Sequence, residues 1–432
     1  MNQDIKEFIH KGPMSSLQVI AISVCLVINM LDGFDVLVMA FTASHVSNEW
    51  GLSGSELGIL LSAGLFGMAG GSLFLAPYAD KYGRRTIALF CLIIISVSMF
   101  LSAMSQGMTQ LAILRAITGV GIGGMLASLN VIVAEYASDK WRSLAVSFLQ
   151  TGYPIGAAIG GSIAAFLIVQ TGWRSVFVFG AVTSAIMIPI VIWRLPESMD
   201  YLLAKRPCNA LKHVNDLLRR MGRDEIETLP EPVFKEKVVS SGFVSLFKDS
   251  IKLSTLLIWS SFFMVMFSFY FVLSWTPKLL VAAGLSAEQG ISGGVLLNVG
   301  GIVGGLLLGY MSSRFNLQKL IGVYMLATAA LMIIFGILTS SLTTALVISL
   351  FIGFFLFGSM IGLYALAPNL YTASIRTTGM GWAIGIGRIG AILSPFIAGV
   401  LLDAGWGTAI LFIVFALPLT VSMITVNLIR AN

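Results

Sequence analysis

A few charged side chains lie inside long apolar runs, where charge is costly. Asp32 and Asp35 share one such run. Arg115 and Arg388 lie in two others, and Glu135 lies nearer the end of the run that holds Arg115. A charged group at the centre of a membrane-spanning helix costs on the order of 2.5–3.5 kcal/mol, so each one requires a partner or a function. These residues are the first candidates for chemistry.

The two carboxylates of the first run stand three residues apart, with Gly33 between them. On a helix this spacing places Asp32 and Asp35 on one face, and Gly33 is expected to loosen the backbone there. Away from water, mutual repulsion favours keeping a proton on one of the two, which makes a proton carrier. The alternative is a structural pair that a neighbouring basic or hydroxyl group satisfies. We expect Asp32, Asp35 and Glu135 to take part in proton coupling.

Arg388 is flanked by Gly385, Gly387 and Gly390, which would let a ligand or another helix approach its guanidinium. An arginine cannot shed its charge, so an anion must lie beside it. That anion is a substrate carboxylate or a first-helix aspartate across the bundle, and the two can alternate. Aromatic and amide side chains in other runs could contact an aromatic ligand, although both are also common in helix packing. The expected substrate-binding residues are Arg388, Tyr270, Trp275, Tyr364 and Asn369.

The composition requires a membrane as the main solvent. Of the 432 residues, 57% are hydrophobic and 11% are charged, whereas soluble domains carry roughly 25% charged residues. Apolar runs of the ~17–25 residues that cross a bilayer recur along the chain, and they are too continuous for barrel strands. We predict an all-α integral membrane protein with helices near residues 17–44, 55–78, 86–105, 109–135, 144–168, 174–194, 255–280, 291–312, 319–339, 343–367, 378–402 and 407–429.

One long polar stretch divides these helices into two sets of six. We expect a bundle at 1–194, a linker at 195–254 and a second bundle at 255–432, with related loops at 76–85 and 309–315 suggesting a repeat around a central site. Lys and Arg cluster in the termini, the linker and alternate loops, while the opposite face holds Arg174 and Lys278. The positive-inside rule then places both termini on the cytoplasmic side of the membrane, which we expect to be a bacterial inner membrane. The formal charge of +6 is explained by this topology, so we expect no nucleic-acid partner.

The loop after the second helix has the composition of a conformational latch. Asp80 can accept hydrogen bonds from a helix N-terminus and pair with a cation, and the arginines can bind linker carboxylates or lipid phosphates. A plain cluster of positive charge would explain neither Asp80 nor Gly83. Including the buried arginine of the fourth helix, the residues expected to act in gating are Asp80, Lys81, Gly83, Arg84, Arg85 and Arg115.

This loop resembles the signature of the major facilitator superfamily, with Ala76 in place of a glycine. Nearly the whole chain is similar to one branch, the aromatic acid:proton symporters, through the motifs at 32–35, 80–85, 135–142, 376–382 and 387–390. The resemblance implies import of benzoate-like or hydroxybenzoate-like acids with protons, by a monomer. It also implies that Asp32 and Asp35 take part in proton coupling, that Asp80 and Arg84 act in the conformational cycle, and that Arg376 and Arg388 serve transport of the anion. We expect Arg142 and Arg376 to act in gating as well.

Three other functions are alternatives to proton-coupled uptake of an organic anion. A proton-driven exporter of amphipathic aromatic drugs such as quinolones would use the same acids and aromatic residues. A receptor or scaffold is disfavoured, because the linker of about sixty residues is too short for a sizeable signalling domain. An enzyme is disfavoured because no nucleophile–base pair or metal set can be assembled from the sequence. We expect no cofactor.

Overall fold

The described part of the chain is almost entirely helical. A computed structural model describes residues 14–229, 243–247, 251–338, 341–372 and 375–429. The first six spans are α2 (Ser16–Trp50), α3 (Gly54–Gly70, continued by η1 at Gly71–Leu75, η2 at Ala76–Tyr78 and α4 at Ala79–Tyr82), α5 (Arg84–Ala103), α6 (Met108–Tyr136), α7 (Arg142–Thr171) and α8 (Arg174–Arg194). The second six are α11 (Lys252–Ala282), α12 (Ala287–Ser312), α13 (Leu317–Ile337), α14 (Leu342–Leu366, continued by η4 at Ala367–Leu370), α15 (Arg376–Asp403) and α16 (Thr408–Leu428). All twelve are long and apolar enough to cross a membrane, which confirms the predicted fold class.

The helix ends follow local capping chemistry rather than hydropathy. The first helix was expected to end near residue 44 but continues to Trp50, because its polar last turns stay helical until Gly51 adopts a left-handed φ of 62°. Such a glycine is a common helix terminator. Two residues later, Ser53 and Glu56 form a capping box that starts α3.

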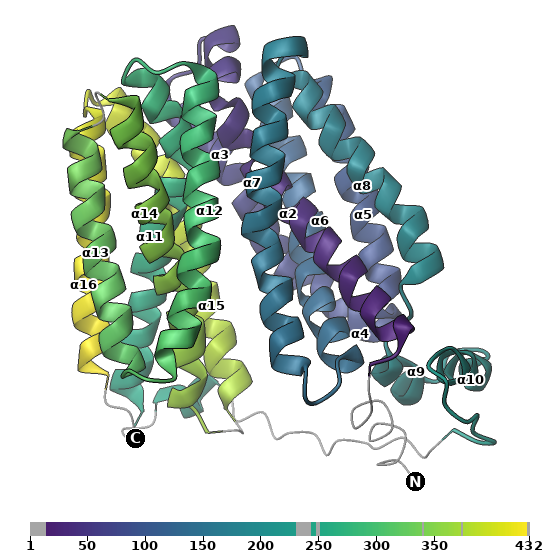
Figure 1. Cartoon of the computed structure of the whole chain (residues 1–432). Coiled ribbons are helices and arrows are strands. Elements are labelled where there is room, and N and C mark those ends of the chain that lie inside the picture. Colours follow the sequence, from purple (N-terminus) through teal and green to yellow (C-terminus); the bar gives the residue numbers. More distant parts are fainter. Residues whose placement is uncertain (1–13, 230–242, 248–250, 339–340, 373–374, 430–432) are drawn as a thin grey trace.

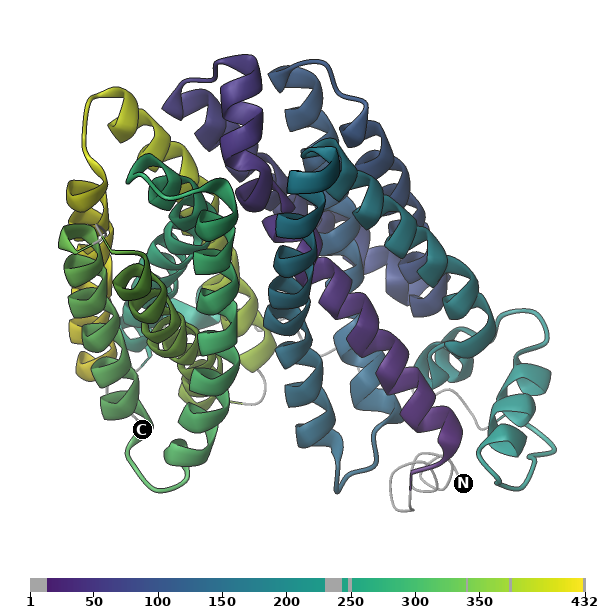
Figure 2. The same cartoon turned by 45° about the horizontal axis from the view of Figure 1, so that its top comes forward.

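The spans form two bundles that meet at one end and diverge at the other. The first six helices form one bundle and the last six the other, and both views show their separation increasing toward the end that carries the start of α2 and the end of α16 (Figures 1 and 2). We call this the terminal end, and the opposite end, where Gly54 approaches Asp403, the closed end. The helix pairs in contact across the two bundles include α3 with α15, α7 with α12 and α2 with α11.

The closed end is held by polar contacts between α3 and α15. The Asp403 carboxylate accepts hydrogen bonds from the backbone N–H of Gly54 at 2.6 Å and of Ser55 at 2.8 Å. Further along α3, toward the middle of the bundles, the Ser62 hydroxyl donates to the carbonyl of Ile392 at 2.7 Å. A helix N-terminus carries partial positive charge, so a carboxylate from the other bundle stabilises this arrangement.

The segment between the bundles forms a small helical unit at the terminal end (Figure 1). It comprises α9 (Met199–Lys205) and α10 (Ala210–Arg220), and further along lies the short helix η3 (Phe243–Phe247). Leu17, at the start of α2, shares an apolar cluster with Met199, Leu202 and Leu217. The unit therefore packs onto the first bundle.

Candidate functional site

The two aspartates of α2 lie deep in the first bundle. Asp32 is 2% exposed and Asp35 is 1% exposed, and both lie near the middle of one uninterrupted helix. Gly33 does not loosen this helix as expected. A β-carbon at Gly33 would overlap the carbonyl oxygen of Tyr153, so the glycine instead lets α7 touch α2 between the two acids.

Arg115 supplies positive charge to this pair from α6. Its guanidinium donates one hydrogen bond to the backbone carbonyl of Asp35 and another to the Sδ atom of Met99 at 3.0 Å. Its charge acts on the Asp35 carboxylate, which also interacts with the Ser184 hydroxyl of α8. A cation and a hydroxyl of the same bundle thus compensate Asp35, as the structural-pair alternative requires for this residue.

Asp32 has a different environment. Within the described residues, the charge that acts on it is that of Asp35 rather than that of a cation. Its Oδ2 atom makes no hydrogen bond, and neither carboxylate oxygen of Asp35 makes one, so the two acids differ in the charges around them. Burying an ionised carboxylate without a partner is far more costly than burying the neutral acid. Asp32 is therefore the more natural of the two to hold a proton.

Arg388 lies in the second bundle among phenol side chains. Its charge acts on the hydroxyls of Tyr153 in α7, Tyr270 in α11 and Tyr364 in α14. Tyr364 is 38% exposed, and its ring lies edge-on to that of Phe262 in α11, with the ring centroids 5.4 Å apart. The guanidinium is only partly buried, so an anion can reach it.

The glycines around Arg388 divide into two kinds. Gly387 and Gly390 lie against α11, where a β-carbon would contact Met266 and Phe263 respectively. Gly385 has no atom within 4 Å of the place where its β-carbon would lie. The first two therefore pack helices, and Gly385 leaves free space one turn from the guanidinium.

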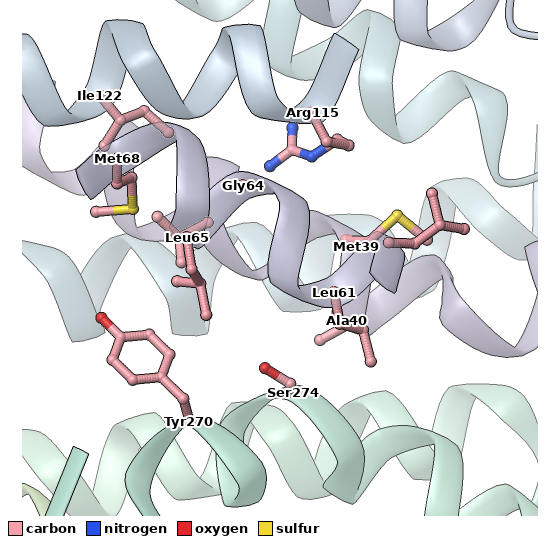
Figure 3. Close-up of a pocket in the computed structure, with 12 residues that line it drawn as sticks. Met39, Ala40, Leu61, Gly64, Leu65, Met68, Arg115, Ile122, Tyr270 and Ser274 are labelled. Carbon is pink, nitrogen blue, oxygen red and sulfur yellow. The ribbon is translucent and has the colours of Figure 1, made fainter. Parts of the chain in front are cut away.

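A pocket lies between the bundles beside Arg115. Figure 3 shows Tyr270 and Ser274 of α11 on one side of it, facing Leu61 and Leu65 of α3. Its other lining residues are mostly apolar, with Arg115 contributed by α6. Mostly apolar walls with a few polar groups are the kind of lining that small-molecule sites have.

The other predicted binding residues lie elsewhere. Trp275 is 1% exposed, and its indole N–H donates to the carbonyl of Pro395 at 3.0 Å, so the side chain joins α11 to α15. Asn369 is exposed in η4 and donates to the carbonyl of Ala365 at 3.2 Å. These contacts match the structural alternative for both residues.

The predicted latch residues gather at the terminal end of the first bundle. Arg84 forms ion pairs with Glu135 of α6 and, at 3.2 Å, with Asp80, and Asp80 itself is largely exposed. The Ser198 hydroxyl donates to Glu135 at 2.6 Å and accepts from Arg84 at 3.3 Å. Glu135, predicted to couple protons, is thus a member of this cluster.

The chain turns tightly at the latch. Gly83 has a φ of 102°, and a β-carbon there would collide with the Glu197 carboxylate. Glu197 accepts from the backbone N–H of Arg85 at 3.0 Å, and the Arg85 side chain donates to the carbonyl of Ile192. A linker carboxylate does bind here, but to the backbone N–H of Arg85 rather than to the arginine side chain that we expected.

Three predicted gating residues lie outside these contacts. The Lys81 ammonium lies 5.1 Å from the centroid of the Tyr82 ring. Arg142 pairs with Asp139 at 3.0 Å and donates to the carbonyl of Ala134. Arg376 is exposed at the first turn of α15.

Comparison with known proteins gives the family. The model of the Major Facilitator Superfamily matches residues 24–383. The chain is 32% identical to the gallate transporter of Pseudomonas putida, over 96% of this chain and 92% of that protein. It is 31% identical to a 4-hydroxybenzoate transporter of Acinetobacter baylyi, over 98% of this chain and 93% of that one, and 29% identical to a benzoate transport protein of the same organism, over 96% and 89%. This chain belongs to the major facilitator superfamily.

Solved structures of other superfamily members have the same fold. The inward-open xylose transporter of Escherichia coli superposes with a TM-score of 0.74 at 17% identity, covering 94% of this chain and 95% of the other. The protein is thus a multi-pass membrane transporter related to aromatic acid transporters, and not an enzyme.

Sequence reasoning missed some residues of this transporter's central site. Tyr153, Ser184 and Met99 all contact or act on the charged groups described above. None of them is charged, so the free-energy cost of placing charge in a membrane did not identify them as candidates. The one available signal was the glycine-rich stretch around Tyr153, which indicates close helix contact.

Proposed function

We propose that this transporter carries an aromatic carboxylate together with a proton, by alternating access. The observation that carries the proposal is the placement of Arg388 in the second bundle, where its charge acts on one phenol of the first bundle and two of the second. The buried acids of α2 lie in the first bundle. The guanidinium would hold the carboxylate, since its planar fork matches that group. The names of the relatives support an aromatic acid as the substrate class.

The count of buried charges favours symport over transport of the anion alone. With Asp32 ionised and no substrate, two acids (Asp32 and Asp35) balance two arginines (Arg115 and Arg388). With Asp32 protonated and one carboxylate bound, the site is again neutral. Either event alone leaves a net unit charge, which is unfavourable in a closed site of low dielectric constant.

The pocket between α3 and α11 supplies a place for the aromatic ring. Tyr270 belongs both to this pocket and to the phenols around Arg388. The ring would lie against Leu61 and Leu65, and Tyr270 would connect this pocket to the region of Arg388. Apolar walls with a few placed polar groups are typical of small-molecule sites.

Two moving units, 1–194 and 255–432, joined by the linker at 195–254, would carry out the cycle as a monomer. With the termini in the cytoplasm, as the distribution of Lys and Arg favours, the divergent terminal end faces inward and substrate leaves toward the cytoplasm of the bacterial cell. The cluster around Arg84 and Glu135 would hold the terminal end of the first bundle in shape while the bundles rock.

Uptake into proteoliposomes tests the proposal. Labelled benzoate, 4-hydroxybenzoate and gallate are offered under an inward proton gradient, and at least one should accumulate, with loss of accumulation when an ionophore collapses the gradient. Arg388→Gln removes a charged hydrogen-bonding partner worth about 1.5–3 kcal/mol, so binding should weaken roughly 10- to 150-fold.

Lys212→Gln is the matched control, because Lys212 is an exposed cation on α10 outside the central site. It should transport at the unmodified rate. No accumulation of any of the three acids by the unmodified protein, or full activity of Arg388→Gln, would refute the proposed function.

A further inference from the structure

Tyr153 lies at the contact between α7 and the acid-bearing turn of α2. Its carbonyl oxygen fills the space left by Gly33, and one turn along α7, Gly156 packs in the same way on Met30. Before it in the chain, Gly152 lies against Leu26. Three glycines thus fix the position of Tyr153 next to Asp32.

The Tyr153 hydroxyl makes no hydrogen bond to any described residue, although it is buried from solvent. Leaving a buried hydroxyl unsatisfied costs about 1–3 kcal/mol, so native proteins rarely do so without a reason. Asp32 acts electrostatically on this hydroxyl from one bundle, and Arg388 and Tyr270 act on it from the other. The phenol is therefore within electrostatic range of both the acid of the first bundle and the cation of the second.

Few ionisable groups bear on this region. Besides Asp35 on the same helix, they are Arg115 of α6, Cys91 of α5, and Tyr270 of α11 with Arg388 of α15 beyond. The other helices packed on α2, namely α3, α8 and α12, carry charged side chains only near their ends. Asp35 is compensated by Arg115, so Asp32 is the acid left to compete for the Tyr153 hydroxyl.

Building on the proposed function, we infer that Tyr153 couples the two cargoes by giving its single O–H to only one of two acceptors. When Asp32 is ionised, the phenol donates its O–H to Asp32 and cannot donate it to the substrate. When Asp32 is protonated, the acid donates to the phenol oxygen, and the phenol O–H turns to the substrate carboxylate held by Arg388. The phenol does not transfer a proton. Tyr153 is a positioning residue whose hydrogen-bond acceptor depends on whether Asp32 is protonated.

Reciprocity follows from this competition. If a proton on Asp32 strengthens substrate binding, then bound substrate must strengthen proton binding by the same factor. One hydrogen bond to a charged group corresponds to about 1.5–3 kcal/mol, so the affinity for substrate should differ roughly 10- to 150-fold between the two protonation states of Asp32.

Binding of 4-hydroxybenzoate, benzoate and gallate to the purified full-length transporter, measured from pH 5 to pH 9, tests the inference. The unmodified protein should bind more tightly as the pH falls through the titration of Asp32. Tyr153→Phe should bind roughly tenfold or more weakly at low pH and depend less steeply on pH, because only the balance of charge then links the proton to the anion. Its thermal stability should not fall, because the lost hydroxyl has no partner to leave behind.

Tyr364→Phe is the matched control. The charge of Arg388 acts on this phenol too, but Asp32 does not figure among the groups that act on it. It should lower affinity and keep the pH dependence. Asp32→Asn approaches the same link from the other side, and combining it with Tyr153→Phe should add no further loss of pH dependence.

The outcomes separate the two proposals. Binding by the unmodified protein, with an unchanged pH profile in Tyr153→Phe, overturns the role of Tyr153 and leaves the proposed function standing. An unchanged pH profile in Asp32→Asn overturns both the role of Tyr153 and the assignment of the transported proton to Asp32. Failure of the unmodified protein to bind any of the three acids overturns both.

Discussion

Removing the Asp403 carboxylate should release the closed end of the transporter. This side chain spans the two bundles, accepting two hydrogen bonds from the first turn of α3. Asp403 is exposed, so solvent screening reduces the combined contribution of charge and hydrogen bonding to about 1 kcal/mol. Since 1.4 kcal/mol is a factor of ten, the ratio of closed to opened molecules should fall about fivefold in Asp403→Ala. Asp403→Asn keeps one acceptor and should fall between.

Distances between spin labels at the closed end measure this ratio. Asn48, near the end of α2, and Ala283, just after α11, are exposed and belong to different bundles. Cysteines placed there can be labelled in a Cys208→Ser background, because the remaining native cysteines, Cys25 and Cys91, are buried. In Asp403→Ala the long-distance population should grow about fivefold.

Glu288→Gln provides the matched control for this experiment. Glu288 is also an exposed acid at a helix N-terminus of the closed end, but it lies in the first turn of its own helix, α12. Its substitution should leave the distances unchanged. Equal distributions in Asp403→Ala and the unmodified protein, or an equal shift in Glu288→Gln, would show that the carboxylate does not hold the bundles together.

Three further pairs of substitutions test separate parts of the structure through thermal stability. Gly33→Ala should destabilise by about 1–3 kcal/mol through overlap with α7, whereas Gly381→Ala, where the added carbon meets open space, should be neutral or stabilising; equal effects would contradict the packing described. Glu135→Gln leaves Arg84 without its main partner and should lower the free energy of unfolding by about 3 kcal/mol. Asp80→Asn removes an exposed partner and should lower it by under about 1 kcal/mol. The reverse order would refute the latch geometry. Asp35→Asn leaves Arg115 uncompensated and should destabilise by about 3–5 kcal/mol, while Asp32→Asn should not destabilise, because no cation among the described residues depends on it.

The sequence was sufficient for the helices because a membrane imposes one simple rule on the chain. Every backbone polar group in the bilayer must be satisfied, so each long apolar run becomes a helix. The error at the end of α2 arose because residues 45–50 are polar yet still helical, and only the capping glycine at Gly51 ends the helix. Hydropathy measures what a segment prefers as solvent, whereas capping decides where the helix stops.

Which side chains meet could not be deduced in the same way. Asp35 and Arg115 are eighty residues apart, and their contact depends on how α2 and α6 are rotated in the bundle. The sequence left the partner of the acids open between a neighbouring basic group and an arginine across the bundle, and packing of α6 against α2 provides Arg115. Trp275 shows the converse, because an aromatic residue in an apolar helix can face a cavity or a neighbouring helix, and only the bond to Pro395 reveals which.

The division of charge between the bundles bears on how the cargoes can be linked at all. The acids and Arg115 belong to the first bundle, and Arg388 belongs to the second. If all four lay in one bundle, a proton could influence the anion in every conformation, and coupling would not depend on the transport cycle. Because they are separated, the coupling that we propose between proton and anion can operate only while α2 and α7 of one bundle lie against α11 and α15 of the other. Tyr153 lies where the two bundles approach each other. The conformation that brings the bundles together at the site is therefore also the one in which the proposed coupling between proton binding and anion binding acts.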